Sequence, residues 1–115
     1  MMPSFVKNKN KGYIVESGSN QKGQYVKFSN GLAICKGSFN ITENTSEMQI
    51  NFPINFVNTG YSVTVTSTYA YSKKIFFAVV ASNKESFKVF PTLIDTNTVP
   101  TMKGSGYYIA MGNWK

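Results

Sequence analysis

Hydrophobic and polar residues alternate with a period of two along most of the chain after residue 23. The clearest case is Tyr61–Ser67, where Tyr61, Val63 and Val65 alternate with residues that carry hydroxyl groups. Ser46–Phe52 alternates in the same way. This pattern is typical of strands with one buried and one solvated face. No window of helical length has apolar residues at the three-to-four spacing of a helix, so the chain is expected to be all-β.

A tight hairpin is expected near the start of this alternating region. The ranges Gln24–Phe28 and Leu32–Gly37 read as strands, and Ser29-Asn30-Gly31 lies between them. An Asn-Gly pair supplies the two positive φ angles of a type I′ turn, which is the usual connection of a two-residue hairpin. The sequence therefore predicts that these two strands pair with each other through such a turn.

Three later segments are apolar on both faces rather than on one: Lys74–Ser82, Ser86–Leu93 and Gly106–Gly112. A strand with two apolar faces is expected to be covered on both. In a domain of 115 residues the second cover is expected to be another copy of the chain. The sequence thus predicts a small antiparallel β-sandwich, or a partly open barrel, of about seven strands that packs against another subunit.

The first 23 residues differ in composition from the rest of the chain. They are rich in Lys, Asn, Gly and Ser, with one short apolar patch, and are expected to form a connector from a longer protein. Residues 24–115 are expected to form the sandwich. Met1–Lys11 lacks the apolar region of a signal peptide, and the longest apolar run, Ile75–Ala81, is too short to cross a bilayer.

The net charge of +7 comes from twelve lysines, because the chain has no arginine. Proteins that read nucleic acids depend on arginine for two-pronged phosphate and base contacts, so this composition argues against such a partner. Two interpretations of the positive charge stay open. It either keeps the surface solvated or attracts the domain to an anionic cell surface.

The residues available for catalysis are few. The chain has no histidine, which excludes a Ser–His or Cys–His nucleophile, and it lacks the ligands for a zinc site. Of the five carboxylates, Glu43 and Glu47 are expected to be solvated loop charges rather than a glycosidase pair. Cys35, the only cysteine, is expected to be a buried structural thiol. We therefore expect no enzyme activity, no cofactor and no metal ion.

Three segments resemble a known family. They are the hairpin Gly23–Gly37, the stretch Phe52–Phe56 with the strand Tyr61–Thr66 after it, and the closing segment Tyr108–Lys115. Together they resemble, in the same order, the C-terminal receptor-binding domain of phage and prophage tail fibres. The resemblance covers residues 13–115.

The resemblance implies a lectin-like β-sandwich that forms a homotrimer at the tip of a fibre, joined to the rest of the tail fibre through residues 1–23. It implies attachment to a host-cell surface receptor, often a polysaccharide, by a virion component that acts outside the cell without entering a membrane. It carries over no receptor-contacting residue by position. Two alternatives stay open: a trimerisation cap that binds no receptor, and a barrel that binds single-stranded nucleic acid.

Candidate receptor contacts are expected in two polar segments that carry aromatic or charged side chains. Exposed tyrosine rings stack on sugar C–H faces, while amide and charged groups bind hydroxyls and acidic groups. Tyrosines of the first segment have an alternative role, packing against a neighbouring subunit, and Trp114 is expected to be a structural anchor. The candidate receptor-binding residues are Tyr69, Tyr71, Lys73, Lys74, Asp95, Asn97 and Lys103.

Overall fold

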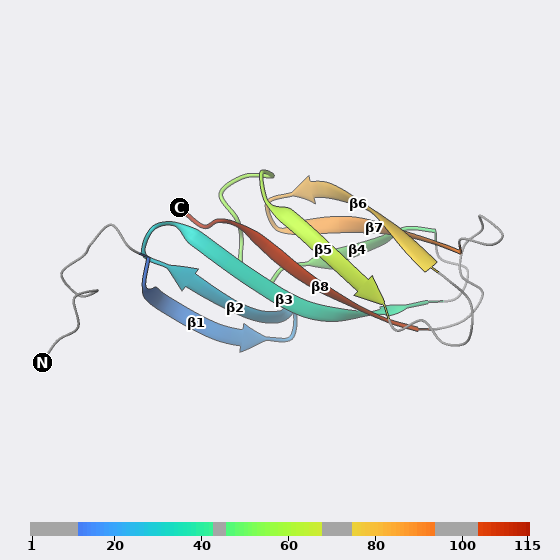
Figure 1. The fold of residues 1–115 in the computed structure, drawn as a ribbon, viewed down its shortest axis with the longest axis horizontal. Coiled ribbons are helices and arrows are strands. Elements are labelled where there is room, and N and C mark those ends of the chain that lie inside the picture. Colours follow the sequence, from blue (N-terminus) through green and yellow to red (C-terminus); the bar gives the residue numbers. More distant parts are fainter. Residues whose placement is uncertain (1–11, 43–45, 68–74, 94–103) are drawn as a thin grey trace, which may run out of the picture.

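A computed structural model describes residues 12–42, 46–67, 75–93 and 104–115. The described part contains eight strands, all in antiparallel pairs, and no helix (Figure 1). The prediction of an all-β antiparallel fold is confirmed. The strands are β1 (Ile14–Asn20), β2 (Gly23–Phe28), β3 (Leu32–Ile41), β4 (Met48–Asn51), β5 (Ser62–Ser67), β6 (Ile75–Asn83), β7 (Ser86–Leu93) and β8 (Gly104–Asn113).

The strands form two sheets packed in two layers (Figure 1). The larger sheet has the order β1-β2-β3-β8-β5, and the smaller has the order β4-β7-β6. The longest ladder joins β3 to β8, from the pair Leu32 and Asn113 to the pair Ile41 and Gly104. Because β3 and β8 are neighbours in the middle of the larger sheet, this sheet joins segments that are far apart in the sequence.

Rings from both layers fill the space between the sheets. Phe52 packs edge-to-face on Phe56 at 5.0 Å between ring centroids and stacks on Phe87 at 5.3 Å. Tyr108 of β8 meets Phe87 of β7 at 5.2 Å, which joins the two sheets directly. All four side chains are at most 2% exposed. Edge-to-face and offset ring pairs of this kind add to the free energy of apolar burial.

The hairpin between β2 and β3 is confirmed, but its turn differs from the prediction. The amide of Gly31 donates to the carbonyl of Phe28 at 3.0 Å, so Ser29 and Asn30 are the central residues of the turn. Gly31 follows with a φ of 99°. This is a three-residue loop whose glycine forms a bulge, whereas a type I′ turn would place Asn30 and Gly31 in the centre.

The expected connector also contains a strand. The segment Ile14–Asn20 pairs with β2 along its length, from Ile14 opposite Phe28 to Asn20 opposite Gly23. The strand count is therefore eight rather than about seven in the described part of the chain. This segment shows no alternation because most of its residues are exposed on both sides of an edge strand.

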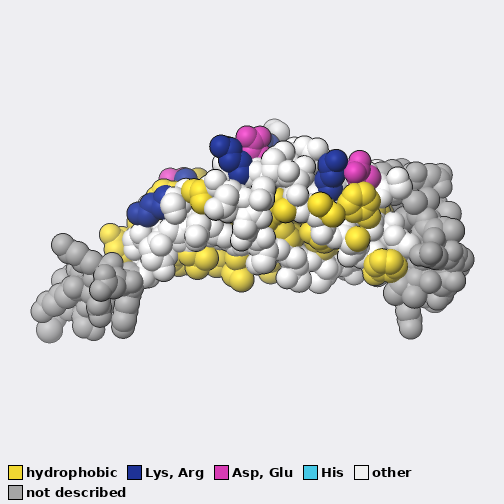
Figure 2. Space-filling view, turned by 90° about the horizontal axis from the view of Figure 1, so that it is seen from above, with side chains coloured by type: hydrophobic (Ala, Val, Ile, Leu, Met, Phe, Trp, Pro, Cys, Tyr) yellow, Lys and Arg dark blue, Asp and Glu magenta, His cyan; other side chains and the backbone are white. Residues whose placement is uncertain are grey.

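The strand β6 is an edge strand of the smaller sheet and exposes apolar side chains on both of its faces. Phe76 and Val80 on the outer face are 45% and 49% exposed. Val79 is on the inner face, opposite the buried Val89, and is still 37% exposed. Figure 2, seen from above Figure 1, shows hydrophobic side chains gathered over the part of the molecule where β6 lies. The apolar character of both faces is confirmed, and a single copy of the chain leaves both partly uncovered.

The C-terminal segment is hydrogen-bonded to the turn between β2 and β3. The indole Nε1 of Trp114 donates to the carbonyl of Phe28 at 2.8 Å, and its backbone amide donates to the carbonyl of Gly31 at 2.8 Å. The ring also lies 5.1 Å from the ammonium groups of Lys27 and of Lys115. Trp114 thus packs against the core as expected of a structural anchor.

Candidate functional site

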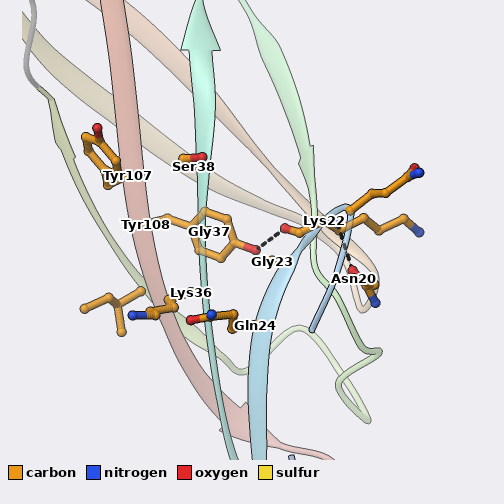
Figure 3. Close-up of a pocket in the computed structure, with 11 residues that line it drawn as sticks. Asn20, Lys22, Gly23, Gln24, Lys36, Gly37, Ser38, Tyr107 and Tyr108 are labelled. Carbon is orange, nitrogen blue, oxygen red and sulfur yellow. Dashed lines mark hydrogen bonds between the residues drawn. The ribbon is translucent and has the colours of Figure 1, made fainter. Parts of the chain in front are cut away.

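A hollow of about 480 Å³ lies where the β1–β2 hairpin ends beside β3. The strand β2 pairs with β3 only as far as Lys36, whereas β8 continues along β3 to Ile41. The end of the hairpin therefore makes a step in the sheet, and the hollow fills this step. We call it the hairpin pocket. Its lining residues are Asn20, Gln21, Lys22, Gly23, Gln24, Lys36, Gly37, Ser38, Tyr107, Tyr108 and Ile109 (Figure 3).

Two glycines allow the hairpin end to approach β3 and β8 closely. Gly23 has a φ of 145°, and a Cβ atom there would collide with the carbonyl oxygen of Lys36. A Cβ at Gly37 would lie 2.7 Å from a ring carbon of Tyr108 and 2.9 Å from the carbonyl oxygen of Lys22. Only glycine accommodates such contacts without displacing the neighbouring atoms. The wall of the pocket therefore depends on the absence of side chains at these positions.

The turn that forms the rim is held by three hydrogen bonds. The side-chain oxygen of Asn20 accepts from the amide of Lys22 at 2.8 Å, and its side-chain nitrogen donates to the carbonyl of Pro53 at 3.0 Å. From the core, the hydroxyl of Tyr108 donates to the carbonyl of Lys22 at 3.3 Å (Figure 3). Burial raises the pKa of Tyr108, so this hydroxyl stays protonated and remains a donor. The rim is thus anchored on two sides.

Strand register brings the functional side chains of the pocket into rows on the outer face of the larger sheet. Gln24, Lys36 and Ile109 are directly opposite one another across three strands. Ser38 and Tyr107 form the next row along. Tyr107 is 46% exposed and Ile109 is 53% exposed. Figure 3 shows Lys36 and Gln24 next to each other on the side where Tyr107 projects. The rows combine an ammonium group, an amide, a hydroxyl and an exposed aromatic ring.

Among the described residues, no carboxylate lies at ion-pair distance from the two lysines of the pocket, Lys22 and Lys36, in contrast to Lys27 and Lys88. Lys27 and Lys88 each lie within that distance of a glutamate, at 3.6 and 3.4 Å. No carboxylate lines the pocket either. Its positive charge is therefore available to a ligand.

Glu16 of β1 is a carboxylate of the same sheet that does have polar partners. Glu16 accepts a hydrogen bond from the hydroxyl of Tyr25 at 2.7 Å and lies 3.6 Å from the ammonium group of Lys27. The hydrogen bond from Tyr25, more than the charge of Lys27, lowers the pKa of Glu16 below its ordinary value. Glu16 is therefore ionised and engaged at neutral pH.

The residues proposed from the sequence as receptor contacts all lie outside the described residues. They are Tyr69, Tyr71, Lys73, Lys74, Asp95, Asn97 and Lys103. The strand ends that flank the two segments do lie together, because Ser67 pairs with Gly106 on β8 and Ile75 pairs with Leu93 on β7. The candidate contacts stay a prediction.

The hairpin pocket contains none of those candidates. One signal in the sequence did mark it: Lys36 interrupts an otherwise apolar strand, between Cys35 and the glycine of the pocket wall. A second signal was that Tyr107 and Ile109 are on the opposite face of their strand from Tyr108, which the structure shows to be buried. What the sequence did not show was that Gln24 and Tyr107 lie on one surface, because this requires the pairing of β2, β3 and β8.

The described residues offer little reactive chemistry. Cys35 is fully buried. Burial raises the pKa of its thiol to about 12, and this effect is larger than the opposite effect of a hydrogen bond with the backbone of Ile54. A thiol in that state is a poor nucleophile at neutral pH. No group of three potential metal ligands occurs within the described ranges. In the same part of the chain, no helix is long and apolar enough to span a membrane.

Comparison with known protein families identifies the domain. The model of the C-terminal domain of gp53-like tail fiber proteins matches residues 27–113, which include seven of the eight strands in whole or in part. The chain belongs to this family. It is therefore a C-terminal domain of the tail-fibre type. No curated protein sequence matches the chain at a significant level.

Solved structures share the fold of this tail-fibre domain. An N-truncated R1-type pyocin tail fiber has a TM-score of 0.60 and 14% identity, with 95% of this chain and 93% of that chain covered. The C-terminal part of the R2 pyocin fiber of Pseudomonas aeruginosa has a TM-score of 0.59 and 13% identity. That match covers 86% of this chain but 26% of the fiber chain, so the tail-fibre domain corresponds to about a quarter of that structure.

Proposed function

We propose that this tail-fibre domain is the tip that attaches the particle to a receptor on the host-cell surface, and that the receptor is a polysaccharide. The observation that carries the proposal is the hairpin pocket. It combines the exposed ring of Tyr107 with the polar groups of Gln24, Lys36 and Ser38 on one rigid sheet face. Aromatic rings flanked by converging hydrogen-bonding groups suit sugars, which have both C–H faces and hydroxyls.

We propose further that the domain acts as a homotrimer with β6 near the three-fold axis. In a cyclic trimer each subunit meets its two neighbours through two different surfaces. The two exposed faces of β6 supply such surfaces, with Phe76 and Val80 on one side and Val79 on the other. The hairpin pocket lies on the other sheet, so contacts at β6 leave it accessible. Three pockets on one tip would raise a weak single-site affinity into stable attachment.

The apolar faces of β6 also support the alternative function, a cap that trimerises the end of the fibre without binding a receptor. The two functions differ in one measurable property. A receptor-binding tip added in excess blocks adsorption of the particle that carries it, whereas a cap leaves adsorption unchanged.

The test is therefore a competition experiment with the purified 115-residue chain. Host cells are incubated with increasing chain before the particles are added, and unadsorbed particles are counted. We expect adsorption to fall with chain concentration, and fluorescently labelled chain to bind the same cells. Unchanged adsorption, together with no binding of labelled chain to the host, would leave the cap as the function.

A further inference from the structure

The charge of the hairpin pocket indicates the class of polysaccharide that it accepts. Lys22 and Lys36 line it, no carboxylate does, and within the described part of the chain neither lysine lies at ion-pair distance from an acidic group. We propose that the pocket binds an anionic polysaccharide, one whose repeating unit carries a carboxylate or a phosphate group. This inference rests on the proposed function of the domain.

Lys36 is the central cation of the site. Register places it directly opposite Gln24 on one side and Ile109 on the other. In this row Lys36 is therefore between Gln24, whose amide can bind hydroxyls, and the apolar side chain of Ile109, which is 53% exposed. A hydrogen bond from an ammonium group to an anionic oxygen is about twice as strong as a neutral one. An acidic sugar fits this row better than a neutral sugar of the same shape.

The exposed ring of Tyr107 lies one row farther along the same face, next to Ser38. A sugar ring that contacts Lys36 through its acidic group can place its C–H face on Tyr107 or its neighbour Ile109. Specificity then comes from two independent contacts, one electrostatic and one apolar. Loss of either contact should weaken binding without abolishing the fold, because both side chains are largely exposed.

Lys22 indicates a polymer rather than a single acidic sugar. It lies in the turn at the rim, and Figure 3 shows its side chain extending away from Lys36. In this arrangement the two side chains extend in different directions and do not meet at one anionic group. A chain with an acidic group in every repeat can reach both, one at the centre of the site and one at the rim. The turn, held by Asn20 and Tyr108, fixes the backbone from which this second lysine side chain extends.

Single-stranded nucleic acid is also an anionic polymer, and it serves as an outcome of the test rather than as the proposal. Proteins that bind it stack successive bases on several aromatic rings along a groove. The pocket has one exposed aromatic ring, Tyr107, because Tyr108 is 2% exposed. This arrangement suits one sugar contact better than a run of stacked bases.

The experiment uses the full chain and polysaccharide extracted from a bacterial strain to which labelled chain binds. Binding is measured to the native polysaccharide, to a sample whose carboxylates have been reduced to alcohols, and to a dephosphorylated sample. The variants are Lys36→Gln and Lys22→Gln. Lys84→Gln is the matched control because it changes the net charge equally and is exposed in the turn between β6 and β7, away from the pocket. Thermal unfolding and oligomer size are compared for each variant.

We expect removal of one type of acidic group to weaken binding at least about tenfold, which identifies that group as the one recognised. Lys36→Gln should weaken binding to the native polymer similarly, and Lys22→Gln should do so to a smaller extent. Lys84→Gln should change it less than about twofold, because screening limits the effect of a distant charge. Competition by a single-stranded DNA oligonucleotide should be much weaker than by the polysaccharide.

Three results would overturn the inference while leaving the proposed function intact. They are equal binding to the native and both chemically neutralised polymers, equal effects of Lys36→Gln and Lys84→Gln, and DNA that competes as well as the polysaccharide. Failure of the labelled chain to bind any strain, including the host of the particle, would overturn the proposed function and this inference with it.

Discussion

The hydroxyl of Tyr108 donates a hydrogen bond to the backbone carbonyl of Lys22 at 3.3 Å, from a ring that is 2% exposed. The two residues are 86 positions apart in the sequence. The ring packs edge-to-face against core aromatics, while the carbonyl belongs to the turn at the rim of the hairpin pocket. The bond thus holds the turn at the proposed receptor-binding surface against the packed core.

Replacing Tyr108 with Phe should remove this anchor and little else. The ring stays, and the freed carbonyl of Lys22 lies in an exposed turn where water can reach it. We expect the free energy of unfolding to fall by about 1 kcal/mol. Polysaccharide binding should weaken several-fold because the turn loses its tie to the core. Urea unfolding and direct binding measurements on the same samples check both effects.

The matched control for this variant is Tyr61→Phe. The hydroxyl of Tyr61 donates to the carbonyls of Asn83 and Ser86, at 2.8 and 2.7 Å, near the turn between β6 and β7. The Tyr61→Phe variant should lose a similar free energy of unfolding and still bind the polysaccharide. Equal loss of binding in Tyr108→Phe and Tyr61→Phe would mean that the rim needs only a stable fold and not this particular bond.

Polar substitutions on β6 should separate assembly from folding. In the double variant Phe76→Ser and Val80→Thr, two half-exposed apolar side chains are replaced without changing the core. We expect the trimer to dissociate into folded monomers, because a large part of the apolar contact area is lost. Light scattering coupled to size-exclusion chromatography measures the assembly, and circular dichroism measures the fold.

Met111→Thr is the control for the β6 variant. Met111 is 47% exposed on the other sheet, so its replacement removes exposed apolar surface that is not on β6. The trimer should survive this change. A wild-type chain that is monomeric at micromolar concentration, or a trimer that dissociates with Met111→Thr and not with the β6 variant, would contradict the assignment of β6 to the three-fold axis.

The thiol of Cys35 should be inert in the native protein. It is fully buried, and burial raises its pKa to about 12, so almost no thiolate forms near neutral pH. Iodoacetamide should leave Cys35 unmodified at pH 8 in buffer and modify it completely in concentrated guanidinium chloride. Mass spectrometry of the intact chain distinguishes the two states. Rapid modification in buffer alone would show that the strand β3 opens readily.

Stability should fall at alkaline pH. Burial raises the pKa values of Cys35, Tyr61 and Tyr108 above their ordinary values of 9.0 for the thiol and 10.0 for the phenols. Above those values the unfolded chain loses protons that the folded chain keeps, so the free energy of unfolding decreases as pH rises. Well below pH 9 these three groups are protonated in both states and leave the stability unchanged.

Urea unfolding at a series of pH values measures this decrease. In Cys35→Ala the first part of the fall, which begins near the ordinary pKa of a thiol, should be absent, while the part that begins near 10 should remain. A wild-type curve that stays flat through this range would show that these groups ionise as readily in the folded chain as in the unfolded one.

Local sequence rules predicted the strands that have one buried and one exposed face. The alternation of Val63 and Val65 with hydroxyl residues is a direct consequence of the two-residue repeat of a strand between core and solvent. The strand Ile14–Asn20 was missed because it has no buried face to impose alternation. It pairs through backbone groups with β2, and backbone hydrogen bonds leave little trace in side-chain composition.

The same distinction explains the site. Polar loops with tyrosines drew attention to residues such as Tyr69 and Tyr71, since composition is visible in the sequence. The hairpin pocket instead arises from register: Gln24, Lys36 and Ile109 meet only when β2, β3 and β8 pair. The turn type was predicted wrongly for the same reason. The position of the hydrogen bond between Gly31 and Phe28 depends on how β2 and β3 are aligned, and the local sequence does not specify this.

The sequence by itself therefore determined the all-β class, the buried thiol, the absence of histidine chemistry and the two-sided apolar character of β6. Each of these depends on the identity or local periodicity of neighbouring residues. Only the tertiary structure decided which residues share a surface, where the sheet has a step, and which lysines lie without a carboxylate partner in the described part of the chain. These properties depend on contacts between residues distant in sequence, and a local pattern does not specify such contacts.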